Sequence, residues 1–147
     1  MGQPSRFNGF RVMSLVPATV LTTAVTNVEG TVFTDLLGMQ VLAVQAALVY
    51  GSGGTSIDVY IQTSFDGGTT WVDIMQFAFT TASATRISSC RSLTAVAANY
   101  TPTMGTLTAS TIKDGLLGTS VRAYYSSVGT YAGATTLTVI GTSKGGW

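Results

Sequence analysis

The sequence has no histidine and only one cysteine, Cys90, among its 147 residues. An intrachain disulfide is therefore excluded, a zinc site made of Cys and His would need more ligands than the chain owns, and a Ser-His-Asp triad has no base. We expect no cofactor and no metal site. Arg86 and Arg91 lie near Cys90 in the sequence and can lower a thiol pKa, but without a histidine partner we interpret Cys90 as a small half-buried residue.

Charged side chains are also scarce, at 9% of the chain, against roughly 25% in average globular domains. Seven basic and six acidic residues give a net charge of +1, and the basic ones are scattered. This pattern excludes the electrostatic footprint of nucleic-acid binding and a basic membrane-surface helix. Such a surface is typical either of a protein that buries itself against neighbours in an assembly or of a neutral, threonine-rich secreted β-domain.

Long apolar runs are absent as well. The longest, LLGMQVLAVQAALVY, is interrupted by Gly38, Gln40 and Gln45, and a spanning helix needs about 20 apolar residues. Near the N-terminus the apolar run VMSLV is too short for the hydrophobic region of a signal peptide. We therefore expect synthesis in a cytosol and no membrane partner.

The sequence does contain strand patterns along most of its length. Residues 57–63 alternate strictly between apolar and polar side chains, as in a half-buried strand. Residues 70–79 are predicted to pair with them across an Asp-Gly-Gly turn. Residues 120–127 and 134–141 predict a second hairpin, and residues 39–50 a long strand that leads into a glycine-rich hairpin.

Weaker patterns complete the predicted fold. Residues 18–27 and 31–37 predict two more strands divided by Glu29-Gly30, residues 10–15 predict a further strand or an arm, and residues 91–119 predict a long connection. About eight strands without a helical pattern predict one all-β domain over 1–147, an antiparallel β-sandwich or jelly roll. Residues 1–14 are a possible N-terminal arm of this domain, and residues 142–147 a C-terminal tail.

The octet SFDGGTTW, residues 64–71, resembles the Asp box (S-x-D-x-G-x-T-W) of sialidase-type propellers. Asp66 is placed to accept backbone amides across the turn, the two glycines permit positive φ, and Trp71 is expected to cover the hairpin. Asp boxes are structural in the families that carry them, and a propeller needs several blades. We therefore interpret the octet as a turn-stabilising motif built by Ser64, Asp66, Gly67, Gly68, Thr70 and Trp71.

Sugar chemistry can also be sought directly, because a glycosidase needs two carboxylates at a fixed separation. Asp58 and Asp73 lie on the two strands of the first predicted hairpin, roughly opposite each other. A catalytic pair and two solvent-facing carboxylates are the alternatives. We favour the second and expect no enzymatic activity.

Two longer runs carry a family resemblance: GTSIDVYIQTSFDGGTTWVDIMQFAF and LLGTSVRAYYSSVGTYAGATTLTVIGTSKG. They resemble small β-sandwich virion structural proteins of tailed bacteriophages, which share a DVYIQTSxDGGTTWxD-like hairpin and a late RxxYxxxGT strand pair. The resemblance covers about residues 15–143. It implies a capsid cement or decoration protein on the outer surface of the phage head. Such proteins are usually dimers or trimers that bridge subunits of the major capsid protein.

The resemblance identifies no contact residue, so the interface is predicted from the tails, the long connection and their aromatic and basic side chains. The alternative function is a tail- or fibre-associated module that binds a host surface glycan through aromatic side chains. The residues expected at an interface are Phe7, Phe10, Arg11, Tyr100 and Trp147.

Overall fold

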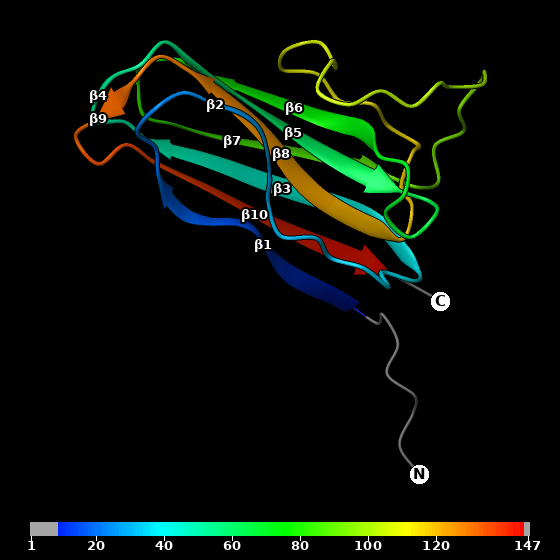
Figure 1. Ribbon diagram of the computed structural model, residues 1–147. Helices are drawn as coiled ribbons and strands as arrows, with labels where there is room; N and C mark the ends of the chain where they lie inside the picture. Colours follow the sequence, from blue (N-terminus) through cyan, green and yellow to red (C-terminus); the bar gives the residue numbers. More distant parts are fainter. Residues whose placement is uncertain (1–8, 146–147) are drawn as a thin grey trace.

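The computed structural model describes residues 9–145, and the side chains of residues 11–145. This part of the chain forms ten β-strands and contains no helix (Figure 1). Eight of the strands build two four-stranded antiparallel sheets. The strands are β1 (Gly9–Val20), β2 (Val25–Glu29), β3 (Met39–Val49), β4 (Ser52–Gly53), β5 (Ser56–Ser64), β6 (Val72–Phe79), β7 (Ala84–Arg91), β8 (Ser120–Val128), β9 (Tyr131–Ala132) and β10 (Thr136–Gly145).

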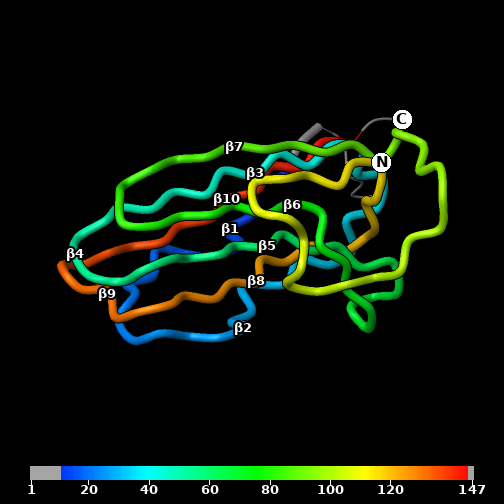
Figure 2. The backbone as a smooth tube through the Cα atoms, turned by 90° about the horizontal axis from the view of Figure 1, so that it is seen from above, coloured from blue at the N-terminus to red at the C-terminus, as the bar shows by residue number. Residues whose placement is uncertain are grey.

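Sheet A has the strand order β1-β10-β3-β7, and sheet B has the order β2-β8-β5-β6. The two sheets lie over each other, and the short pair β4–β9 lies at one end of the stack (Figures 1 and 2). The segment between β7 and β8 lies at the opposite end. The all-β antiparallel sandwich predicted from the sequence is thereby confirmed.

The core lies between the sheets and follows from the alternation of side chains along each strand. In β5, Ile57, Val59 and Ile61 are fully buried, as the sequence pattern predicts. They belong to one cluster with the inward side chains of sheet A, such as Leu42 and Leu137. Burying each large aliphatic side chain contributes about 1.5–3 kcal/mol, so this cluster is the main source of stability.

The β5–β6 hairpin is present as predicted, with pairs from Ile57↔Phe79 to Thr63↔Val72. The second predicted hairpin is wrong, because β8 pairs with β2 and β5 in sheet B while β10 pairs with β1 and β3 in sheet A. The connection between them crosses from one sheet to the other. Tyr131 within it is buried, and its hydroxyl donates a hydrogen bond to the carbonyl oxygen of Thr80 at 3.0 Å.

The glycine-rich hairpin expected after residues 39–50 is also wrong. The long strand is present as β3, but β3 belongs to sheet A and β5 to sheet B. The glycines make room for this crossing. Gly54 has φ +72°, and a Cβ atom there would lie 2.2 Å from the Tyr131 ring. Only glycine fits both the backbone conformation and the close aromatic contact.

Four segments differ from the prediction. Residues 9–14 and 142–145 are strand rather than arm or tail, because β1 and β10 pair from Gly9↔Gly145 to Val20↔Thr136. The strand expected over 18–27 is divided between the end of β1 and β2. Residues 31–37 make only an isolated bridge, Phe33↔Val121.

Candidate functional site

The octet of residues 64–71 forms a turn held by one carboxylate. Asp66 Oδ1 accepts hydrogen bonds from the Ser64 hydroxyl (2.8 Å) and from the amides of Thr69 (3.1 Å) and Thr70 (2.7 Å). These bonds, that of the Thr70 amide first, lower the pKa of Asp66 from 3.8 to about 2. Gly67 and Gly68 have φ +73° and +100°. The geometry is that of a turn-stabilising motif.

Trp71 is 7% exposed and covers a buried arginine rather than the turn alone. The guanidinium carbon of Arg122 lies 4.3 Å from the Trp71 ring centroid and 5.2 Å from that of Tyr124. Arg122 Nη1 contacts Glu29 Oε1 at 2.8 Å, and Arg122 Nε donates to Gln62 Oε1 at 2.8 Å. Burial of the arginine is thus offset by an ion pair, a hydrogen bond and two aromatic faces.

The polar network continues from Gln62 to Asp73, which is fully buried. Gln62 Nε2 donates to Asp73 Oδ1 at 2.8 Å. The carboxylate also accepts the backbone amides of Gly105 (3.0 Å), Thr106 (2.9 Å) and Leu107 (3.1 Å). Asp73 therefore fixes the connection between β7 and β8 against the edge strand β6. Covering an edge strand in this way also blocks pairing with another chain.

Asp58 and Asp73 do not form the pair considered from the sequence. The register places Asp73 opposite Gln62 and Asp58 opposite Ala78. The Asp58 carboxylate accepts a hydrogen bond from Gln76 Nε2 at 2.9 Å, while Asp73 binds the loop amides. The expectation that the two carboxylates lie opposite each other is wrong, because Asp73 is the second residue of β6, next to the turn, whereas Asp58 lies near the opposite end of β5.

A hollow of about 360 Å³ lies between the octet hairpin and the long connection. Phe65, at the tip of the hairpin, is 61% exposed and lines it together with Val96, Tyr100 and Pro102. Lys113 Nζ lies 3.7 Å from the Tyr100 ring centroid. This hollow brings together two segments that the sequence analysis singled out separately.

The other predicted interface residues either lie apart from Tyr100 or fall outside the residues that the structure describes. Phe7 and Trp147 are outside the described residues, and for Phe10 only the backbone, in β1, is described. Arg11 is exposed, and its guanidinium carbon lies 5.5 Å from the Phe33 ring centroid. Arg11 and Tyr100 therefore do not lie at one site, because Tyr100 lines the hollow beside Phe65.

The outward face of sheet A is a surface that the sequence analysis did not identify. Cross-strand pairing aligns Ser14, Ile140, Gln45 and Ile87 in one row across β1, β10, β3 and β7. Ile87 is 69% and Ile140 37% exposed. The rows on either side also consist of uncharged side chains. We call this set the outer face of sheet A: Val12, Ser14, Val20, Ala43, Gln45, Ala47, Val49, Thr85, Ile87, Ser89, Thr136, Thr138, Ile140 and Thr142.

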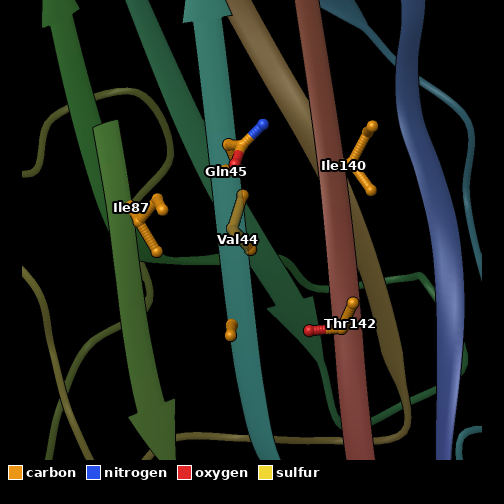
Figure 3. A pocket seen from close by; sticks show the side chains of 6 residues that line it. Val44, Gln45, Ile87, Ile140 and Thr142 are labelled. Atoms are coloured by element: carbon orange, nitrogen blue, oxygen red, sulfur yellow. The ribbon is translucent and has the colours of Figure 1, made fainter. Parts of the chain in front are cut away.

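A shallow hollow of about 240 Å³ lies in the middle of this face. Figure 3 shows Ile87, Gln45 and Ile140 on three neighbouring strands, with Thr142 beside them. Ala43 also lines the hollow and is too short to fill it. In the described part of the chain, charged residues appear on this face one row further along, where Lys144 and Arg91 flank Val41.

Cys90 is buried and faces the core. Burial, reinforced by the charge of Asp114, raises the pKa of its thiol to about 12, opposite to the lowering that nearby arginines can cause. Among residues 9–145, no three His, Cys, Asp or Glu side chains are grouped so that they could hold a metal ion. In the same residues no helix has the length and apolar character needed to cross a membrane.

Comparison with known sequences adds no family to this description. The chain matches no protein-family model, and a search of curated proteins likewise finds no match.

Proposed function

We propose that the chain is a structural protein of a bacteriophage virion, a decoration protein that stabilises the head by bridging subunits of the major capsid protein. The sequence resemblance to small virion β-sandwiches supports this role. The strand order supports a jelly-roll fold, because every connection between the eight long strands except β5–β6 joins the two sheets. Double-sheet jelly rolls occur widely among viral capsid domains.

The observation that carries the proposal is the outer face of sheet A. Soluble antiparallel sheets normally present polar and often charged side chains to water. Here 14 neighbouring outward side chains contain no charge, Lys144 and Arg91 lie in the row at one end, and Val12, Val49 and Ile87 are each more than 60% exposed. Such a face suits a protein that works in contact with other protein subunits, where charged residues are depleted at the centre of the contact.

The experiment compares phage heads made with and without the protein. We expect cryo-electron microscopy of complete heads to show copies at regular positions on the outer surface. We expect heads that lack the protein to release DNA at lower temperature, and purified protein added back to restore the difference. A copy located in a sixfold ring of the tail, or heads equally stable without the protein, would contradict the proposal.

The hollow beside Phe65 favours a second candidate, a module that binds a host surface glycan. Two aromatic side chains, Phe65 and Tyr100, line it with Asn99, and sugar rings stack on exposed aromatic faces. Its volume lies at the lower end of the range of ligand pockets, about 300–1,000 Å³. Glycan-array binding that disappears in Tyr100→Ala, with an unchanged melting temperature, would support this function instead.

A further inference from the structure

The outer face of sheet A has the properties of a buried surface although nothing within residues 9–145 covers it. Val12 (61%), Val49 (63%) and Ile87 (69%) are among the more exposed large apolar side chains. They lie on three different strands of one sheet, with only small or uncharged side chains between them. Seven of the 14 side chains of this face are Ala, Val or Ile and the other seven are Ser, Thr or Gln, so apolar groups are spread over an uncharged face rather than standing singly among charged residues, and exposed apolar surface on this scale marks interaction sites.

We propose that this face packs against the same face of a second copy of the chain. This inference depends on the proposed function only for its biological setting. It specifies which protein covers the outer face of sheet A. Its physical basis is the face itself, so it can fail while the virion role holds.

The distribution of charge favours a second copy over a charged partner. An uncharged face offers no ion pair to an acidic or basic surface, but it can meet itself without repulsion. Within the described side chains, those of residues 11–145, the cations on this side are Lys144 and Arg91, which lie together at one end. A two-fold axis that lies in the interface and perpendicular to the strands places the cationic ends of the two copies far apart. An axis parallel to the strands brings the four cations of the dimer together. We therefore assign the axis across the strands.

The size of the face is sufficient for a weak dimer. Eight paired positions, Val41 to Leu48, run along β3 and β7, or about 26 Å at roughly 3.3 Å per residue. Four strands about 4.8 Å apart span about 19 Å, which gives a projected area of about 500 Å² per copy. Specific interfaces typically bury about 800 Å² per partner, and transient ones less. A concentration-dependent dimer is expected.

The hollow gives the two faces a way to interlock. Ile140 and Ile87 stand on either side of Ala43 and Gln45, and the space of about 240 Å³ is larger than one aliphatic side chain needs. In an isologous contact each copy supplies the same projection and the same recess. Sheets packed face to face lie about 10 Å apart with interdigitated side chains, a distance that an isoleucine can bridge into a recess.

The test is analytical sedimentation of the purified full chain, up to a concentration on the order of 1 mM. At that concentration a dimer with an association free energy of about 4 kcal/mol contains half of the chains. We expect a reversible dimer that added sodium chloride does not weaken, since no ion pair is involved. Ile140→Lys and Ile87→Lys should each weaken it at least about tenfold, because two-fold symmetry introduces every buried charge twice. Leu93→Lys, at a residue 76% exposed in the long connection, should leave it unchanged.

Cross-linking tests the orientation independently. With a short thiol-reactive linker, Gln45→Cys near the proposed axis should join two copies, and Lys144→Cys at the cationic end should not. Native Cys90 is 2% exposed and does not interfere. A chain that stays monomeric at the highest concentration, a trimer, or a dimer equally tight in both lysine variants overturns the proposal. Unchanged circular dichroism and melting temperature establish that the variants fold.

Discussion

Replacing Asp73 with asparagine should loosen the attachment of the long connection to β6 without altering the core, since backbone hydrogen bonds such as that from Lys113 N to Ile74 O remain. The buried carboxylate accepts four hydrogen bonds through its two oxygens, from Gln62 Nε2 and from the amides of Gly105, Thr106 and Leu107. Asparagine has the same shape but replaces one oxygen with an N–H₂ group. In either orientation of the side-chain amide, two of the four hydrogen bonds are lost, because the new N–H₂ group faces two N–H donors.

The magnitude follows from those two bonds. A hydrogen bond to a charged group contributes roughly 1.5–3 kcal/mol, so two contribute about 3–6 kcal/mol. The loop amides are only partly buried and recover part of this loss by binding water. We therefore expect Asp73→Asn to lower the free energy of unfolding by about 3 kcal/mol. For a chain of this size that corresponds to a fall in Tm of roughly 6–12 °C.

Urea unfolding measures the loss of stability, and amide hydrogen exchange locates it. Exchange should rise in residues 103–113, whose amides bind Asp73 and the edge of β6, while β10 keeps its protection. Asp35→Asn is the matched control, because Asp35 is exposed and its φ of 56° is tolerated by asparagine. A loss below about 1 kcal/mol, or increased exchange spread evenly over both sheets, would refute the view that Asp73 anchors this connection.

Two further predictions concern groups with shifted pKa values. Asp66→Asn should lower Tm above pH 4. The pKa of Asp66 in the folded protein is about 2, below its ordinary value of 3.8, so the ionised carboxylate stabilises the fold at pH values above the unfolded pKa. The difference in Tm between wild type and variant should therefore disappear as pH falls towards 2. A difference that is the same at every pH would contradict a role for the ionised carboxylate. The Cys90 thiol, buried and with its pKa raised to about 12, should not react with a thiol reagent at pH 8 in the native protein and should react fully in urea; rapid native labelling would show that the core around it opens.

The parts of the fold that the sequence predicted correctly are local in the chain. The alternation of β5, the Asp-Gly-Gly turn and the β5–β6 hairpin need only neighbouring residues. The errors concern which strands pair with each other. Residues 120–127 and 134–141 have the appearance of a hairpin, yet the intervening turn passes between the sheets because Tyr131 is buried at the end of the sandwich. Pairing across sheets depends on distant strands, and strand patterns alone do not encode it.

The candidate site shows the same division. Asp66 could be assigned from its spacing in the octet, because its partners lie within four residues. The amides that bind Asp73 lie 32–34 residues away, and no local pattern indicates them. The outer face of sheet A did leave a signal in the sequence. Along β10 four successive outward positions, Thr136, Thr138, Ile140 and Thr142, carry no charge before Lys144 is reached, which is unusual for a face exposed to water.

The position of β10 between β1 and β3 has a consequence for synthesis. The first strand and the last strand of the described chain are neighbours, so sheet A cannot close until residues 136–145 have left the ribosome. Until then β1 and β3 each present an unpaired edge, and the chain depends on contacts between residues far apart in sequence, which form slowly. Truncated chains should be substrates for chaperones and proteases. Only a chain translated through β10 can display the finished outer face, so the topology itself prevents shorter products from entering an assembly.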